Sequence, residues 1–256
     1  MFPIKDNIRT DRFPFVTLGL ILVNFVAYIL AVSHGGSFIS GPDLQEEVKY
    51  SAIPFALTHP SYHCGLIQTV SGAAIACRHG AIPNTLPTWE TIFTAMFMHA
   101  SIIHLGGNML FLWIFGNNVE DAMGRIKYLL FYLAGGVAAL ALQVAISPNA
   151  IVPTLGASGA IAAVLGGYIV LYPRARVLTL VFIIFFVTVI ELPAWVLLAV
   201  WFAIQAAYGA ANITTPAGGG GGVAYFAHIG GFIFGVLAIR LLATRPRQPS
   251  RQLPAY

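Results

Sequence analysis

Charged residues are scarce in this 256-residue chain. Only 9% of its residues are Asp, Glu, Lys or Arg, whereas soluble domains carry about 25%. Acidic residues are scarcest late in the chain, where Glu191 is the only one after Asp121. Together with a mean hydropathy of +0.81, this composition excludes an ordinary soluble domain. It also leaves a single late carboxylate, Glu191, which we expect near Arg174 or Arg176 and away from any chemistry.

The few charges separate long charge-free runs, at 13–42, 91–119, 128–173 and 192–239. A membrane helix needs about 20 apolar residues, so the first two runs hold one span each and the last two hold two each. A fifth run, 177–190, is too short to span and is assigned to the membrane interface. We therefore predict six spans, at Phe13–Val32, Ile92–Phe115, Tyr128–Ile146, Ala157–Tyr172, Leu192–Tyr208 and Val223–Ile239.

The expected fold is an all-α polytopic membrane protein that forms a single domain over residues 1–256. Residues 33–91 make its external loop, and the glycine run Gly218–Gly222 is a flexible connection before the last span. The apolar run near the N-terminus is too long for the core of a signal peptide, so we expect an uncleaved anchor.

Lys and Arg gather on one side of the predicted membrane. Eleven of the 13 lie before the first span, after the second, after the fourth or after the last. Only Lys49 and Arg78 lie in the external loop. The positive-inside rule therefore puts both termini in the cytoplasm, with the chain in a plasma or inner membrane. The net charge of +4 follows from this orientation and gives no reason to expect nucleic acid as a partner.

Cysteine is almost absent: the only two, Cys64 and Cys77, both fall in the external loop. Extracytoplasmic compartments are oxidising, so we expect the two to form a disulfide. Neither lies in a predicted span, and no catalytic or metal role is expected for them.

Three apolar runs carry a reactive side chain, and the depths agree. Ser158 lies 14 residues from the cytoplasmic end of its span, which is about 21 Å along a helix. His228 lies 12 residues from the charged Arg240, and Asn108 lies 12 residues from the charged Glu120, which is about 18 Å in each case. In a hydrocarbon layer about 30 Å thick, all three sit roughly 10 Å below the outer surface. A serine, a histidine and an amide are the components of an acyl-transfer site.

The surroundings of Ser158 and His228 favour that chemistry. Gly156 precedes Ser158 closely, so a helix begins near the serine and offers unpaired N–H groups to a developing oxyanion. Gly231 and Gly235 lie four residues apart and allow close contact between membrane helices. Gly159 supplies a matching small surface, so this packing would bring the imidazole to the hydroxyl.

The segment from His99 to Asn108 adds hydrogen-bond donors. His104 and Asn108 are four residues apart and share a helix face, so both can point at one oxyanion. His99 is nine residues before Asn108, about 180° away on a continuous helix, and receives a structural role near the loop. The spacing of the two histidines does not put two metal ligands on one face, and neither a metal nor a cofactor is expected.

Together these motifs resemble the rhomboid intramembrane serine proteases of the bacterial type. The resemblance rests on His-Ala-Ser-Ile-Ile-His-Leu-Gly-Gly-Asn at 99–108, Gly-Ala-Ser-Gly at 156–159, Ala-His-Ile-Gly-Gly at 227–231 with Gly235, and Val119-Glu120 followed by Gly124. It implies a six-helix bundle in which Ser158 is the nucleophile and His228 the base. It also implies that His104 and Asn108 hold the oxyanion, and that single-pass transmembrane proteins are the substrates.

Two positions depart from the family pattern. Many members have a Trp-Arg pair in the first external loop, whereas Trp89 is followed here by Glu90. Some members stack a tyrosine on the catalytic histidine, four residues after the serine, where this chain has Ala162. The imidazole of His228 must therefore be held by another group.

Two other functions stay open at this point. The first is a catalytically inactive rhomboid-like protein that binds or escorts membrane helices, which the presence of both Ser158 and His228 disfavours. The second is a proton-coupled transporter that uses His104 and His228. Transporters are typically built from inverted repeats with broken helices, and none is visible in the sequence.

Overall fold

The computed structural model describes residues 2–70, 72–183, 186–214 and 223–243, so the expected glycine connection Gly218–Gly222 lies outside the described residues. The helices are α1 (Phe15–His34), α2 (Leu44–Tyr50), α3 (Pro54–Thr58), α4 (Thr88–Thr94), α5 (Ile102–Phe111), α6 (Asn117–Met123), α7 (Arg125–Ile146), α8 (Ser158–Leu171), α9 (Ala194–Thr214) and α10 (Tyr225–Leu242). The strands are β1 (Phe2–Asp6), β2 (Gly36–Ser37), β3 (Gly41–Pro42), β4 (Tyr62–Thr69), β5 (Gly72–His79), β6 (Arg176–Ile183) and β7 (Phe186–Pro193).

The described helices confirm a helical membrane protein. Four of them, α1, α7, α9 and α10, are long and apolar enough to cross a membrane. A fifth span is counted if the bent pair 88–97 and 102–123 is taken as one. The helix α8 has 14 residues and is shorter than a typical span. The six-span count therefore stays a prediction.

The predicted continuous helix over Ile92–Phe115 is wrong, because the chain bends by 77° between its two halves. A 3₁₀ turn at Ala95–Phe97 ends the first half. The second half begins anew at α5, where the Ser101 hydroxyl oxygen accepts a hydrogen bond from the His104 backbone N–H at 3.1 Å. Such an N-cap fixes a helix start, and it leaves His99 outside the helix.

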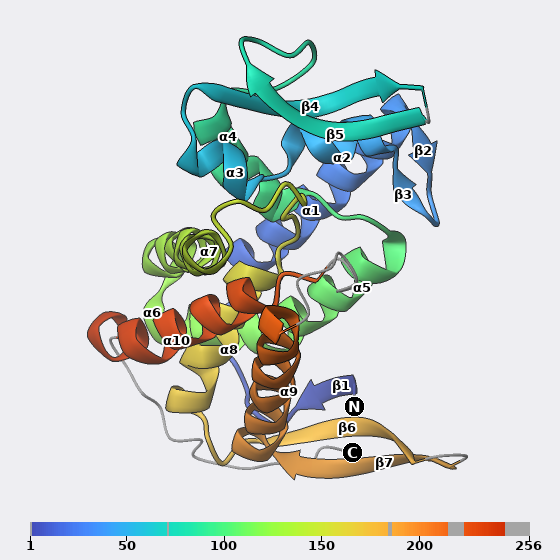
Figure 1. Ribbon diagram of the computed structural model, residues 1–256. Coiled ribbons are helices and arrows are strands. Elements are labelled where there is room, and N and C mark those ends of the chain that lie inside the picture. Colours follow the sequence, from blue (N-terminus) through green and yellow to red (C-terminus); the bar gives the residue numbers. More distant parts are fainter. Residues whose placement is uncertain (1, 71, 184–185, 215–222, 244–256) are drawn as a thin grey trace.

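The expectation of an all-α fold is also wrong. The described residues include a three-stranded antiparallel sheet in the order β1-β6-β7 and two hairpins, β2-β3 and β4-β5. The run 177–190, which is too short for a membrane helix, contributes most of the residues of β6 and β7. Figure 1 shows the β1-β6-β7 sheet and the β4-β5 hairpin at opposite ends of the molecule.

The helix α8 occupies the centre of the bundle (Figure 1). Every residue from Gly159 to Tyr168 is buried, and α7 and α10 pack against α8 and against each other. In contrast, α1 and α7 expose large apolar side chains, such as Leu22 and Leu130, which suits helices that face lipid. The start of α8 is therefore enclosed by helices that come from distant parts of the chain.

Residues 35–87, apart from residue 71, form a cap of short elements over one end of the bundle. Its β4-β5 hairpin pairs Cys64 with Cys77, and the two side chains are joined by a disulfide. The cap is tied to the loop before α8 by an isolated bridge, in which Ala52 and Thr154 exchange both backbone hydrogen bonds, at 3.0 and 2.8 Å.

Candidate active site

Ser158 and His228 are in direct contact. The serine Oγ lies 2.8 Å from the imidazole Nε2. Ser158 is the first residue of α8, and His228 lies in the first turn of α10. Both side chains are half-buried. This is the geometry in which an imidazole can take the proton of an attacking hydroxyl.

The residue two positions before Ser158 has a backbone conformation that only glycine adopts readily. Gly156 has φ of +114°, and its N–H donates to the carbonyl of Ala95 at 2.8 Å. The helix then begins at Ser158, so the N–H groups of its first turn have no partner within the helix. The positive end of the α8 dipole thus lies at the serine.

Close contact between α8 and α10 brings the pair together. A Cβ added at Gly231 would overlap the carbonyl oxygen of Gly159, and one added at Gly235 would overlap the carbonyl oxygen of Ala163. The two backbones therefore touch at both positions. The small residues named from the sequence are the ones at which the helices cross.

The other nitrogen of His228 is held by a residue that the sequence analysis missed. Gln205 of α9 places its Oε1 2.8 Å from His228 Nδ1. Trp201, one turn earlier on the same helix, lies with its ring centroid 5.8 Å from that of His228. The available signal was Gln205 itself, an amide within the charge-free run 192–239, because polar side chains in spans tend to be functional.

The imidazole of His104 lies beside Gly156, in the segment that leads into Ser158. A Cβ at Gly156 would stand 2.9 Å from Cε1 of His104 and 3.6 Å from Ser158 Oγ, so the imidazole and the hydroxyl border one space. Within the described part of the chain, the ring nitrogens of His104 make no hydrogen bond. Its N–H is therefore available to an oxygen in that space.

His99 and Asn108 contact each other, which corrects the prediction that they lie on opposite faces. The Asn108 side-chain amide is 2.9 Å from His99 Nε2, and both side chains are buried. The face calculation assumed one helix through both residues, whereas His99 precedes the start of α5. This contact is compatible with the structural role that the sequence analysis gave to His99.

Ser158 also lines a small cavity of about 30 Å³ between α7, α8 and the start of α10. Its walls are mostly small or apolar residues, including Ala95, Gly136, Ala139 and Ala227. A volume of this size accepts one water-sized group.

The remaining candidate positions lie away from the pair. Trp89 is 65% exposed, so it does not anchor the cap by burial. Glu191 lies in β7 and forms an ion pair with Arg176 at 3.2 Å. Among residues 2–70, 72–183, 186–214 and 223–243, no three His, Cys, Asp or Glu side chains are grouped as a metal site would require.

These features define a class of protein: a helical polytopic membrane protein with a serine–histidine pair inside its apolar bundle. A family model described as the Rhomboid domain matches residues 87–245. The match covers more than half of the chain, and the protein therefore belongs to the rhomboid family.

Named relatives agree with this assignment. The chain is 34% identical over 153 residues to Rhomboid protein 1, mitochondrial, of Saccharomyces cerevisiae, covering 57% of this chain and 40% of that protein. It is 39% identical over 90 residues to Rhomboid protease GluP of Bacillus subtilis, covering 34% of this chain and 17% of that one. It is 40% identical over 78 residues to Rhomboid-like protein 11, chloroplastic, of Arabidopsis thaliana, covering 30% and 28%.

The aligned region spans less than half the length of each of these relatives. Their names indicate mitochondrial, chloroplast and bacterial origins. The candidate spans and the family match indicate a multi-pass membrane protein, whereas the bacterial type and the plasma or inner membrane remain predictions.

Proposed function

We propose that the protein is an intramembrane serine endopeptidase. The observation that carries the proposal is the 2.8 Å contact between Ser158 Oγ and His228 Nε2 at the starts of two apolar helices. Membership of the rhomboid family and similarity to a named rhomboid protease support it. Each of the two residues occupies a position that fits its chemical role.

In the proposed reaction, Ser158 Oγ attacks a peptide carbonyl while His228 takes the hydroxyl proton. The oxyanion is held by the backbone N–H groups at the start of α8, by the free N–H of His104 and by the Asn108 amide. The intermediate collapses to an acyl-enzyme as His228 gives its proton to the leaving amine. Water then repeats the sequence and releases the acid.

The proposed substrates are transmembrane segments of single-pass membrane proteins. A helical carbonyl is already hydrogen-bonded, so the segment must unwind before the serine can reach it. The 30 Å³ cavity beside Ser158 suits a small side chain next to the cleaved bond. No cofactor is required by this chemistry, and the bilayer is the surrounding medium.

The proposed topology has six spans, with both termini in the cytoplasm. It treats α8 as the short fourth span, whose start lies below the outer surface, where water can reach Ser158. The basic ends of α7 and α10 support this orientation by the positive-inside rule.

The two alternatives predict different behaviour. An inactive escort protein would bind substrates without cleaving them, and a transporter would move protons through His104 and His228. Neither explains why the Ser158 hydroxyl is hydrogen-bonded to an imidazole that is itself held on its far side.

The test combines labelling by a fluorophosphonate with cleavage of a single-pass model substrate in liposomes. Ser158→Ala and His228→Ala should abolish both signals while the protein stays folded. Ser33→Ala and His79→Ala, which change exposed residues, are the matched controls and should retain both. Cleavage by Ser158→Ala at the wild-type rate would refute the serine mechanism.

A further inference from the structure

We propose that Gln205 is a positioning residue that fixes the orientation and the protonation of the His228 imidazole. The inference rests on the proposed protease function and deepens it. It assigns to α9 the task that Ala162 of α8 cannot perform.

The hydrogen-bond chain sets the direction of proton transfer. An amide oxygen only accepts hydrogen bonds, so with Gln205 Oε1 at 2.8 Å from His228 Nδ1 the proton of the neutral imidazole must be on Nδ1. The lone pair of Nε2 then faces the Ser158 hydroxyl at 2.8 Å. This is the tautomer that a general base requires.

The position of Gln205 has a cost that this contact offsets. The residue lies in the middle of α9, surrounded in sequence by Ala203, Ile204, Ala206 and Ala207. A primary amide without a partner in an apolar medium loses several kcal/mol, in the range of about 2–7. The imidazole of His228 satisfies its oxygen.

Trp201 completes the support from the same helix. It precedes Gln205 by four residues and therefore shares its face. Its ring lies at 37° to the His228 ring, with 5.8 Å between centroids. Ala162 is fully buried, and its methyl group lies close to the space that a Cβ at Gly231 would fill. Ala162 supplies only a methyl group, and the side chains that contact the imidazole on this side, Gln205 and Trp201, come from α9.

Two substitutions test the role. Gln205→Leu keeps the size of the side chain but removes the acceptor, and kcat should fall roughly 10- to 100-fold with KM little changed. Gln205→Glu restores an acceptor and adds a negative charge that favours the imidazolium. It should recover part of kcat and move the acid limb of the pH–rate profile to higher pH. Tyr208→Phe, which removes another polar group from α9, is the control and should leave kcat and the pH profile unchanged.

A purely structural role would lower the melting temperature of Gln205→Leu without changing the pH profile of either variant. Wild-type kcat in folded Gln205→Leu, or an unmoved acid limb in Gln205→Glu, would overturn the inference. If instead Ser158→Ala cleaves at the wild-type rate in the same assay, the proposed function itself fails. The two failures are thus distinguished.

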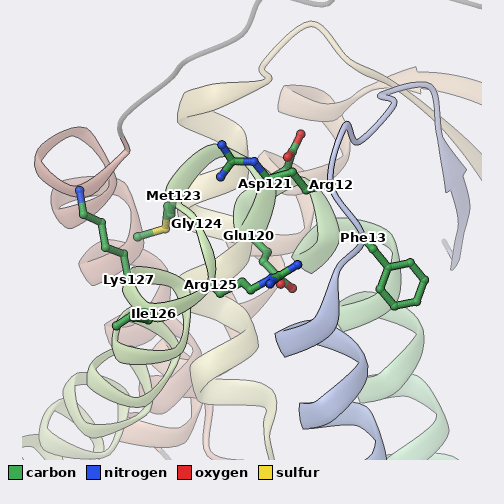
Figure 2. A pocket seen from close by; sticks show the side chains of 9 residues that line it. All are labelled: Arg12, Phe13, Glu120, Asp121, Met123, Gly124, Arg125, Ile126 and Lys127. Carbon is green, nitrogen blue, oxygen red and sulfur yellow. The ribbon is translucent and has the colours of Figure 1, made fainter.

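A second inference comes from a separate cavity. A space of about 550 Å³ lies where the segment before α1, the end of α6 and the start of α7 meet. Figure 2 shows its lining side chains, with Arg12 coming from the segment before α1, and Arg125 and Lys127 from the start of α7, around Met123 and Gly124. The other lining residues are Phe13, Glu120, Asp121 and Ile126.

The cavity lining has more cations than carboxylates, with Arg12, Arg125 and Lys127 against Glu120 and Asp121. Within the described residues, none of these three cations lies within ion-pair distance of a carboxylate. The charge of Arg12 acts on Asp121, and Lys127 Nζ donates to the Leu242 carbonyl at 3.5 Å. The two lining carboxylates are already bound to backbone N–H groups. Glu120 accepts from the N–H of Val16 at 3.0 Å and of Thr17 at 2.8 Å, and Asp121 accepts from a backbone N–H at 3.0 Å.

Apolar side chains lie beside the basic ones. Ile126 is 78% exposed and Phe13 59% exposed, and the Arg125 guanidinium stacks over Phe15 at 4.3 Å. These residues stand at the ends of two helices, α1 and α7, that are apolar enough to span a membrane. Cations beside exposed apolar side chains suit a lipid at a membrane interface, because its phosphate can contact the cations and its acyl chains can contact the apolar side chains.

We infer that this cavity binds the phosphate of an anionic phospholipid headgroup. Arginine pairs with phosphate oxygens in two-point contacts, and lysine adds a point charge. The lipid is favoured over a free phosphate compound because the exposed Phe13 and Ile126 offer nothing to a soluble anion.

The test is native mass spectrometry of delipidated protein with added phosphatidylglycerol or phosphatidylcholine. The pocket variant Arg125→Gln/Lys127→Gln is compared with Arg174→Gln/Arg240→Gln, which removes two charges elsewhere. Bound phosphatidylglycerol should fall at least about fivefold in the pocket variant and little in the control. Equal losses in both variants, or equal binding of phosphatidylcholine, would overturn the site. Displacement by soluble glycerol phosphate at the concentration of the lipid would overturn the lipid assignment.

Discussion

Gly231 of α10 lies against the backbone carbonyl of Gly159 in α8, with no room for even one methyl group between the two helices. This contact lies one residue from the nucleophile on α8 and one turn from the base on α10. The spacing of the helices and the hydrogen bond between Ser158 and His228 are therefore set by the same contact.

Gly231→Val should separate α8 from α10 and break the Ser158–His228 contact. Overpacking typically costs about 1–3 kcal/mol, so both the melting temperature and fluorophosphonate labelling should fall. Gly19→Val is the control, because a side chain at Gly19 of α1 meets nothing within 4 Å. Labelling of Gly231→Val at the wild-type rate would contradict this view of the crossing.

Asn108→Ala should lower turnover more than substrate binding, because the amide acts mainly on the transition state. Loss of one oxyanion donor costs roughly 10²–10³ in rate. The variant also leaves the buried nitrogen of His99 without its partner, at a cost of about 1–3 kcal/mol in stability. His99→Ala separates these effects, since it should destabilise the protein but keep most turnover. Unchanged kcat in Asn108→Ala would leave that residue with a structural role only.

Asp6 should make stability depend on pH. Its carboxylate accepts from Asn118 Nδ2 and from the Tyr168 hydroxyl, both at 2.6 Å, and burial raises its pKa from 3.8 to about 6. Since this pKa is higher in the folded chain than in the unfolded one, the stabilising contribution is complete below about pH 4. It is lost as the pH rises through about 6.

The change in Asp6 corresponds to at most about 3 kcal/mol. Asp6→Asn cannot ionise, so the melting temperature of the detergent-solubilised variant should vary less than wild type between about pH 4 and pH 8. Parallel curves for the two proteins would show that Asp6 does not control this dependence.

Reduction of the Cys64–Cys77 disulfide should destabilise the cap without disabling the reacting pair. The bond joins residues 13 positions apart, and closing a loop of that size is worth about 3 kcal/mol in the chain-entropy model. Cys64→Ala/Cys77→Ala should therefore unfold at lower temperature yet keep fluorophosphonate labelling of Ser158. Intact mass after thiol alkylation reports whether both cysteines are oxidised. Loss of labelling in a folded variant would mean that the cap also shapes the site.

The sequence predicts the long helices well because hydropathy is a local property. The expected spans 13–32 and 128–146 differ from α1 and α7 by at most three residues at either end. Likewise, glycine at positions 159, 231 and 235 indicates a close crossing because only small residues allow one.

Other features depend on information that no single segment contains. Uniform apolarity across 91–119 conceals the 77° bend, and the error carries over to His99. The strands β6 and β7 join β1, which is more than 160 residues away in the chain, so a local pattern cannot predict them. Gln205 is recognisable in the sequence as a polar residue within a span, but its contact with His228 depends on the rotation of α9 about its own axis.

The exchange of hydrogen bonds between Ala52 and Thr154 has a consequence for anyone who tags or grafts sequences into this protein. The segment near Ala52 is hydrogen-bonded to the loop that precedes Ser158, so an epitope inserted there would displace that loop and the nucleophile. Val70, at the end of the β4-β5 hairpin, is fully exposed and belongs to the kind of site that tolerates insertions. A reporter should therefore be placed after Val70, away from the residues that react.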